Sequence, residues 1–246
     1  MAKKPVMPKP SRPRNEREAA LAAKPVIEQK EQKVVSFYGI ERGDFIYYLA
    51  VVFAKAGKLV LVIDNSLSND VYGAVSNYET GDGKLIRQNI VYMTNVNYKR
   101  KEDSPYEIVF IWHGMRLNCD MAAQSDALIL LPNYEPNTLR KMSEHINGMQ
   151  KKVSAVYMRD AVSNAKVKPR TIAGMFGINP QLMYGDIMYD AKDYENYLAF
   201  LYNGSQKFSS LSPGFADFIK DVISMVTGLP DKNVIGMYNM AKNASA

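Results

Sequence analysis

Short apolar runs alternate with amphipathic stretches along most of this chain. The apolar runs that predict strands are Val34–Tyr38, Leu59–Ile63, Asn89–Met93, Ile108–Trp112, Ala127–Leu131, Val153–Met158 and Leu182–Met188. Several of them are almost continuously apolar, which is typical of strands that helices cover on both faces. The alternation predicts an α/β fold with a doubly wound, mostly parallel sheet and helices on both of its faces.

Two amphipathic stretches predict helices that pack against this sheet. The first places its large apolar side chains on one helical stripe: Phe45, Tyr48, Leu49, Val52 and Phe53. Near the other end of the chain, Ser212 and Pro213 can cap and open a helix that Gly228 and Pro230 would stop. The stretch at residues 76–84 is rich in turn-forming residues and predicts a surface loop.

The turn between the first predicted strand and the first predicted helix reads Gly39-Ile-Glu-Arg-Gly-Asp44. A strand, a glycine-containing turn, a helix and a second strand that ends in Asp64 form a unit that commonly binds nucleotide phosphate at its first turn. Three interpretations of this turn are open at this point: a nucleotide-binding loop, the remnant of one, or a chance likeness.

The basic charge of the chain is concentrated in its first 33 residues. The formal net charge is +6, of which +5 lies in residues 1–33, and this segment also holds five of the twelve prolines. Such a segment cannot bury enough apolar surface to fold by itself. We therefore expect a disordered basic tail at residues 1–33 and a folded domain at residues 34–246. Solvation is the simplest role for the tail, and contact with nucleic acid or acidic lipid headgroups is the alternative.

Several classes of protein do not fit this composition. No apolar run approaches the ~20 residues of a membrane-spanning helix, and residues 1–33 lack the apolar core of a secretory signal. Cys119 is the single cysteine and His113 and His145 are the two histidines, so neither a disulfide nor a ligand set of zinc spacing can form. We expect a cytoplasmic protein without a transmembrane segment and without a metal site.

The order of the segments resembles the MinD/ParA group of P-loop ATPases across almost all of residues 34–240. Three runs carry the likeness in register: "YYLAVVFAKAGKLVLVIDNS", "YEIVFIWHG" and "AAQSDALILLPNYEPNTLRKMSEHI". The clearest matches are Leu49-Ala50, Gly57, Val60–Asp64, Asp126–Leu131 and Glu135–Arg140. The resemblance implies a P-loop NTPase-like fold of the MinD/ParA type, with a nucleotide site at the turn that begins at Gly39.

Much of the family's nucleotide chemistry is missing in that register. The family's phosphate loop falls on residues 37–44, where Gly39 is retained but Arg42 replaces the essential Lys. Gly43 replaces the Ser or Thr that binds Mg²⁺ in the family, and Glu41 brings a negative charge into the loop. A carboxylate at this place opposes the binding of phosphate.

The strand that ends in the Walker B Asp in the family ends here in Trp112. Asp64 is the exception, because it matches the acidic residue that helps activate water or hold the metal shell in the family. Phosphoryl transfer depends on positioning and on electrostatic stabilisation by these groups, and most of them are absent. The resemblance thus implies a remnant nucleotide site at Gly39, Arg42, Gly43 and Asp64. No catalytic residue is expected there, and ATP with Mg²⁺ would bind weakly at most.

The resemblance implies a role in positioning rather than catalysis. Degenerate members of the group, such as the TadZ/CpaE-like positioning proteins, place pilus machinery at a cell site. We expect a catalytically silent scaffold for pilus, secretion or conjugation machinery, recruited through its partners to the membrane or a cell pole. The basic tail is a departure, because many such relatives carry a receiver-like domain there. The alternatives are a divergent, active ParA-like ATPase of plasmid or chromosome partition and an unrelated enzyme on the same fold.

A homodimer is also implied, because members of the group dimerise face to face across the nucleotide. Tyr38, Ile40 and Trp112 lie where the phosphate groups would have been. Since interfaces are enriched in aromatic side chains, these three residues are the candidate contacts between the two copies.

Limited proteolysis should trim the chain to a stable core that starts near residue 33, because the tail has no apolar face to protect its backbone. N-terminal sequencing of the resistant fragment would locate the cut. Strong protection of the stretch from Lys9 to Arg17 in the isolated protein would contradict this prediction.

Overall fold

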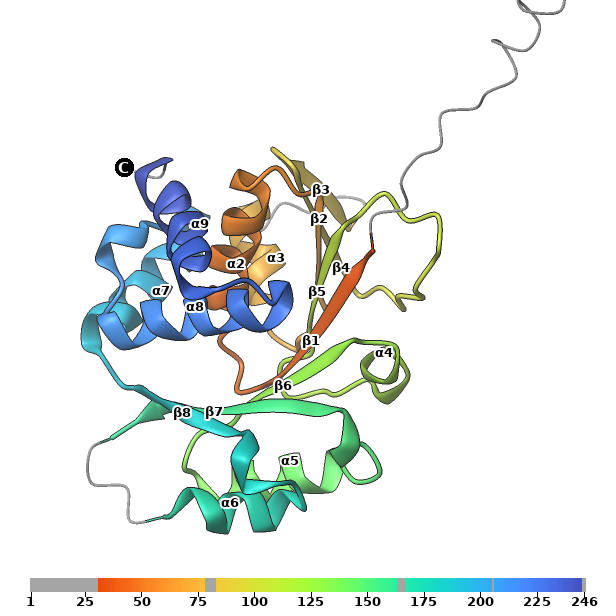
Figure 1. The fold of residues 1–246 in the computed structure, drawn as a ribbon, viewed down its shortest axis with the longest axis vertical. Coiled ribbons are helices and arrows are strands. Elements are labelled where there is room, and N and C mark those ends of the chain that lie inside the picture. Colours follow the sequence, from red (N-terminus) through yellow and green to blue (C-terminus); the bar gives the residue numbers. More distant parts are fainter. Residues whose placement is uncertain (1–30, 78–82, 163–166, 205, 245–246) are drawn as a thin grey trace, which may run out of the picture. The chain divides into compact units, whose positions relative to one another are not determined.

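The computed structural model describes residues 31–77, 83–162, 167–204 and 206–244. The chain divides into two units, residues 1–30 and residues 31–246. The first unit makes up most of the predicted tail and lies outside the described residues. Figure 1 shows the second unit as a sheet with helices on both faces. Its strands are β1 (Lys33–Gly39), β2 (Val60–Asp64), β3 (Lys84–Arg87), β4 (Ile90–Thr94), β5 (Ile108–Trp112), β6 (Ala127–Leu131), β7 (Val153–Ala161) and β8 (Met183–Met188). Its helices are α2 (Asp44–Lys55), α3 (Asp70–Ser76), α4 (Cys119–Ala123), α5 (Pro136–His145), α6 (Pro169–Phe176), α7 (Ala191–Asn203), α8 (Pro213–Thr227) and α9 (Asp231–Ala244), with short 3₁₀ turns η1 (Gln150–Lys152), η2 (Pro180–Leu182) and η3 (Phe208–Ser210).

The strands form one sheet in the order β3-β4-β2-β5-β1-β6-β7-β8. Neighbouring strands are parallel, except that β3 runs antiparallel to β4. The predicted fold class is confirmed, and each of the seven predicted strands is present with ends that differ by at most three residues. Strand β3 was not predicted, because its four residues are mostly exposed and directly follow a turn-rich stretch. The predicted loop at residues 76–84 lies largely outside the described residues.

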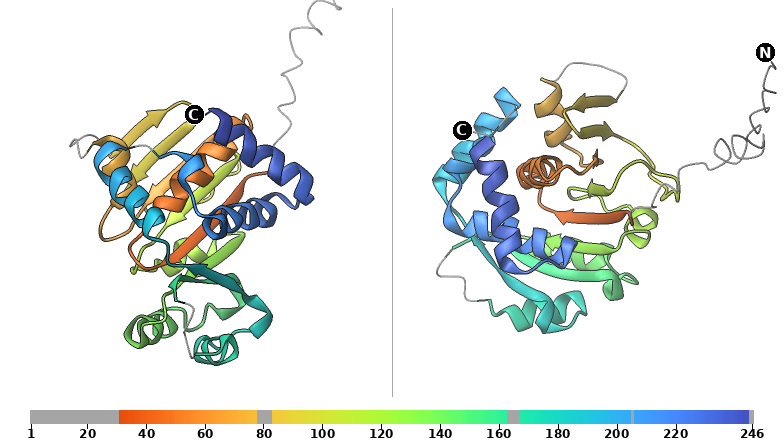
Figure 2. Two further views of the ribbon diagram at one scale, coloured as in Figure 1. Left: turned by 90° about the vertical axis from the view of Figure 1, so that its left-hand side faces the viewer. Right: turned by 45° about the horizontal axis from the view of Figure 1, so that its top comes forward.

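The two faces of the sheet pack against different helices because side chains alternate along each strand. On β1, Val35 and Phe37 join a large core that also contains apolar side chains of α2, α3, α7, α8 and α9. Tyr38 points to the other face and joins a core formed with α5 and α6. Figures 1 and 2 show these two groups of helices on opposite sides of the sheet.

Helices α2 and α8 form where the sequence predicts them. The five apolar stripe residues of α2 are all buried. At the start of α8 the Ser212 hydroxyl accepts the N–H of Phe215, and Gly228 ends the helix with a φ of 65°. Because the left-handed region is open to glycine without strain, Gly228 stops the helix as predicted.

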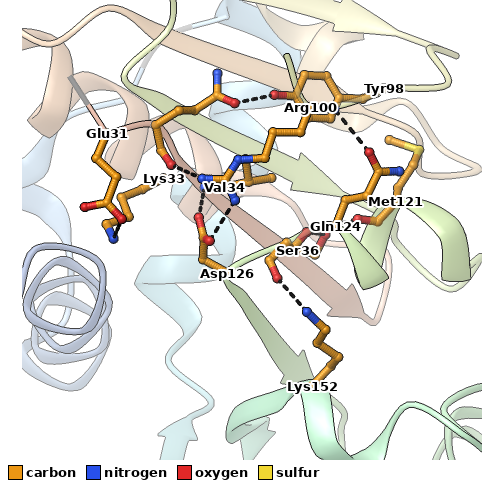
Figure 3. Close-up of polar contacts among 12 residues, drawn as sticks. Glu31, Lys33, Val34, Ser36, Tyr98, Arg100, Met121, Gln124, Asp126 and Lys152 are labelled. Atoms are coloured by element: carbon orange, nitrogen blue, oxygen red, sulfur yellow. Dashed lines mark hydrogen bonds and ion pairs between the residues drawn. The ribbon is translucent and has the colours of Figure 1, made fainter. Parts of the chain in front are cut away.

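Polar contacts anchor the amino end of β1, and Figure 3 shows Arg100 and Asp126 facing each other there. Arg100 donates to the carbonyl oxygen of Gln32 at 2.6 Å and to the Asp126 carboxylate at 2.8 Å. Asp126 also accepts the N–H of Val34 at 2.8 Å, and the Tyr98 hydroxyl donates to the Gln32 side chain at 2.8 Å. Contacts of the folded unit thus extend back to Gln32.

The carboxyl ends of β1, β2 and β5 meet at the opposite edge of the sheet. In the strand register, Trp112 of β5 lies beside Phe37 of β1 and beside Asp64 of β2. The turn after β1 therefore adjoins both neighbouring strand ends. This edge is where ligands bind in open parallel sheets, so the candidate site is built here.

Candidate functional site

The turn between β1 and α2 directs its backbone N–H groups at the protein itself. Gly39 donates to the carbonyl oxygen of Gly114 at 3.0 Å, and Ile40 donates to that of Leu131 at 3.1 Å. Arg42 donates to the carbonyl oxygen of Ile40 within the turn at 2.6 Å. A phosphate loop works through free N–H groups that converge on an anion, and these three are already in use.

Gly39 is retained for a packing reason. A Cβ atom at this position would lie 2.2 Å from the carbonyl oxygen of Leu131, so only glycine allows β1 and β6 to approach this closely. Its presence therefore follows from the sheet and does not by itself indicate a phosphate site.

The N–H group of Gly43, in the same turn, donates to a side-chain carboxylate of the protein itself. Gly43 donates its N–H to Oδ2 of Asp70 at 2.6 Å, and the indole Nε1 of Trp112 donates to Oδ1 of the same carboxylate at 3.1 Å. Asp70 is the first residue of α3 and is buried. Its carboxylate thus occupies the N-terminal end of α2, where the helix dipole favours a negative charge.

Glu41 holds two further loops against the turn. Its Oε1 accepts the N–H of Met115, in the loop after β5, at 2.6 Å. Its Oε2 accepts the hydroxyl of Ser68, in the loop after β2, at 2.8 Å. One side-chain carboxylate therefore connects the three loops at this edge of the sheet without any ligand.

Arg42 turns away from the loop that contains it. Its Nη1 lies 2.6 and 2.7 Å from the two carboxylate oxygens of Asp160, in β7. Its guanidinium also lies over the rings of Tyr194 and Tyr197, with 5.3 and 5.1 Å to the ring centroids. Arg42 is thus engaged in an ion pair and cation–π contacts, and it does not project into the cradle of the turn.

A second arginine, Arg159, also contacts the turn. Arg159 of β7 is buried, donates to the carbonyl oxygen of Arg42 at 2.9 Å and forms an ion pair with Asp44. Its guanidinium stacks over the rings of Phe45 and Phe215. Because buried charges need partners, Arg159 and Asp44 fix the start of α2 against β7.

Asp64 stabilises the start of α3. Its Oδ2 accepts the N–H groups of Val71 and Tyr72 at 2.9 Å, and its Oδ1 accepts the hydroxyl of Ser66 at 2.6 Å. Burial, and then the charge of Asp70, raise the pKa of Asp64 to about 7. The arrangement is that of a helix-capping carboxylate, with its hydrogen-bonding capacity used locally.

Trp112 fills the space beside Gly43. A Cβ atom on Gly43 would lie 2.8 Å from the indole Nε1 and 2.5 Å from a methyl group of Val71. Because this space is closed, a Ser or Thr cannot stand at position 43 while the indole keeps its place.

The three candidate interface residues differ in exposure. Tyr38 and Trp112 are fully buried, so neither offers its side chain to a partner in this structure. The Tyr38 hydroxyl lies 2.6 Å from Nδ1 of the exposed His145, so its polar end is bonded within the chain. Ile40 is partly exposed. The sequence predicted Tyr38 and Trp112 at an interface because nothing in their neighbouring residues indicates that they are buried. Their burial depends on contacts with distant parts of the chain.

The histidines and the other polar groups indicate no metal site. His113 is buried, its Nε2 lies 3.1 Å from the Ser36 hydroxyl, and burial lowers its pKa to about 4. Within residues 31–77, 83–162, 167–204 and 206–244, no group of three or more His, Cys, Asp or Glu side chains could hold a metal ion. No helix of the described residues is long and apolar enough to cross a membrane.

Sequence reasoning missed three charged residues of this network: Asp70, Arg159 and Asp160. Arg159 does carry a signal, because a charge within an apolar strand run requires a buried partner. The two aspartates carry none, since their partners Gly43 and Arg42 lie 27 and 118 residues away along the chain. Contacts at such separations depend on the sheet order.

The geometry does not fit a bound Mg-ATP. The N–H groups of Gly39, Ile40, Arg42 and Gly43 are occupied by protein acceptors. The carboxylates of Glu41, Asp44 and Asp70 add negative charge around the same turn, and a triphosphate would have to displace or neutralise them. Gly39, Arg42, Gly43 and Asp64 do lie at one edge of the sheet, but each is engaged in contacts within the protein.

Replacing Gly43 by Ala should lower the free energy of unfolding by about 1–3 kcal/mol, because the added methyl group overlaps Val71 and Trp112. Gly236→Ala in α9 is the matched control, since no heavy atom lies within 4 Å of its added Cβ. The control should be neutral or stabilising because alanine favours helix. Urea denaturation of both variants measures the difference, and equal stabilities would contradict the tight packing at Gly43.

Replacing Asp70 by Asn should flatten the dependence of stability on pH. The pKa of Asp64 is about 7 in the folded protein against 3.8 ordinarily, so the native state binds more protons in this interval and the unfolding free energy falls as the pH rises through it. Burial raises the pKa of Asp70 as well, so the Asn variant removes a second group that binds a proton more readily in the folded state, and without the charge of Asp70 the pKa of Asp64 decreases. The variant should therefore lose at least ~1 kcal/mol less than the wild type between about pH 5 and about pH 8.

Chemical denaturation across this pH range makes the measurement, with Asp103→Asn as an exposed control that should keep the wild-type profile. His113 titrates alike in all three proteins, so its contribution cancels. Parallel profiles for wild type and Asp70→Asn would show that Asp70 does not raise the pKa of Asp64.

Comparison with known proteins supports the fold. No protein-family model and no curated protein sequence matches the chain. Among solved structures, MinD in the MinC:MinD cell division protein complex of Aquifex aeolicus is similar, with a TM-score of 0.53 and 13% identity over 86% of this chain and 95% of that chain. The McdA–ATP complex of Cyanothece has a TM-score of 0.51 and 14% identity over 82% of this chain and 98% of that chain. Identities this low establish the fold alone: the chain has the P-loop NTPase fold of MinD/ParA type.

Proposed function

We propose that this protein is a catalytically silent relative of the MinD/ParA-type ATPases and acts as a localisation or assembly scaffold. The contact that carries the proposal is the one between the Asp70 carboxylate and the N–H of Gly43, at 2.6 Å. This internal anion takes the position at the start of α2 that a nucleotide phosphate takes in a working P-loop. The site is then a structural element of the fold.

Electrostatics disfavour an exchange of this carboxylate for ATP. The turn contains Glu41 and Asp44 and adjoins Asp70, while the guanidinium of Arg42 is bound to Asp160. A triphosphate would add several negative charges in a buried setting where like charges repel strongly. Of the two arginines at the turn, Arg42 is paired with Asp160 and Arg159 with Asp44, so neither guanidinium is free to stabilise a transferring phosphoryl group.

The proposal of a scaffold also rests on the loops after β2 and β5. Glu41 connects both loops to the turn through Ser68 and Met115. These loops therefore keep one arrangement without a nucleotide cycle. A surface that does not depend on nucleotide suits a protein whose role is to hold partners in place.

The proposed partners are a second copy of the chain and proteins of a pilus, secretion or conjugation assembly. A MinD-type fold does bind another protein in the MinC:MinD complex. The TadZ/CpaE-like positioning proteins are the nearest functional analogy for a silent member of the group. The basic segment at residues 1–33 would add contact with nucleic acid or acidic lipid, and partner binding would bring the protein to the membrane or a cell pole.

Mg-ATP at millimolar concentration should neither be hydrolysed above background nor change the fluorescence of Trp112. Trp112 is the single tryptophan, and its indole donates to the carboxylate that a phosphate would have to displace. A Kd weaker than ~1 mM corresponds to less than about 4 kcal/mol of binding, as expected when the N–H groups of Gly39, Ile40, Arg42 and Gly43 already have protein acceptors. Sedimentation should give the same dimer with and without ATP.

Two results would reverse this proposal. A saturable fluorescence change at micromolar ATP would show an open nucleotide site, and turnover that Asp64→Ala abolishes would assign Asp64 a catalytic role. Both would favour the alternative, a divergent ParA-like ATPase of partition. A monomer at tens of micromolar under both conditions would contradict the homodimer.

A further inference from the structure

A hollow lies at the amino ends of the parallel strands, at the edge of the sheet opposite to the turn between β1 and α2. Its volume is about 320 Å³, and it is formed by the end of α2, the β3–β4 turn and the segment that precedes η3. Its lining includes Lys55, the last residue of α2, and Arg87, the last residue of β3. Helix α2 starts at the carboxyl end of β1 and runs back across the sheet. Its last residue, Lys55, therefore lies near the amino ends of the strands.

The charge of this hollow is positive. Lys55, Arg87 and Lys207 line it, and none of the three has an ion-pair partner among the described residues. No acidic side chain of the described residues is part of the lining. A concave surface of one sign of charge concentrates the opposite charge, since its low-dielectric walls focus the field.

An unpaired amide lies in the wall of the same hollow. Gln206 is 8% exposed, and neither its Oε1 nor its Nε2 has a hydrogen-bond partner in the described part of the chain. Buried amides in folded proteins nearly always have partners, so an unpaired one requires an explanation. The amide lies in the same lining as three positively charged side chains. A negatively charged ligand that accepts a hydrogen bond would give the Gln206 amide the partner that the protein does not provide.

We propose that this hollow binds a small molecule that carries phosphate groups. Its volume lies at the lower end of the range of small-molecule sites. Arg87 provides a planar fork for phosphate oxygens, while Lys55 and Lys207 add point charges to the lining. The Gln206 amide would donate to the same group, and the Tyr47 side chain lines the wall beside it. The site is separate from the phosphate-loop turn and does not depend on the proposed scaffold function.

Titration calorimetry with inorganic tripolyphosphate at low ionic strength tests the site. The double variant Arg87→Gln/Lys207→Gln should weaken binding by at least about tenfold, because two charge-assisted contacts are lost. Lys141→Gln/Lys151→Gln is the matched control, since it removes the same charge from exposed positions of α5 and η1. The control should bind as the wild type does.

The variant Gln206→Met adds a readout that simple charge attraction would not give. It replaces the unpaired amide by an apolar group of similar size, so the ligand-free protein should melt at a higher temperature. The same variant should bind tripolyphosphate more weakly, because the hydrogen-bond donor is gone. A rise in melting temperature without any loss of affinity would remove Gln206 from the site.

The remaining outcomes are equally decisive. Equal weakening by the two double variants, or no binding of tripolyphosphate to the wild type, would overturn the proposal and leave only diffuse attraction of anions. A short DNA duplex distinguishes the source of the phosphate. Binding of the duplex without binding of tripolyphosphate would show a nucleic-acid surface in place of a small-molecule site, and it would also overturn the proposal.

Discussion

The buried carboxylate of Asp70 organises the carboxyl edge of the sheet. It accepts the N–H of Gly43 at the start of α2 and the indole N–H of Trp112 at the end of β5, while it begins α3 itself. Three elements are thus connected by one side chain. An internal carboxylate is held in place by the fold and loses no translational freedom on binding, whereas a free phosphate does. A dissolved anion must therefore compete with a partner that is always present.

Both arginines at the turn are paired with carboxylates, because a single buried charge is unstable. Arg159 pairs with Asp44, and Arg42 pairs with Asp160, so β7 holds the turn from two sides. Such pairs add little net stability, since desolvation offsets much of their attraction, but the loss of one partner would leave the other uncompensated. Their effect is to fix the position of the turn. The Arg42 guanidinium is paired with Asp160 and lies over two tyrosine rings, so it does not point into the turn.

Glu41 extends the same arrangement to the neighbouring loops. Its carboxylate accepts hydrogen bonds from Ser68 and Met115, which join the loops after β2 and β5 to the turn.

The sequence by itself determined the fold class and most of the elements. Continuous apolar runs mark buried parallel strands because both faces of such strands are covered, and the Ser212 cap and the Gly228 stop are local signals that need no tertiary contact. The sequence also shows that Arg42, Gly43 and Trp112 differ from the residue types expected at these places in the P-loop ATPases it resembles. Strand β3 lacked a signal because it is short and exposed.

Only the tertiary structure decided which groups surround the turn between β1 and α2. Asp70 and Asp160 approach the turn from separate elements, and their distances to Gly43 and Arg42 depend on strand order and register. For the same reason the burial of Tyr38 and Trp112 could not be read from their neighbours along the chain. Residue types show which chemistry a chain has lost, but the contacts that replace it are long-range, and a linear pattern carries no information about them.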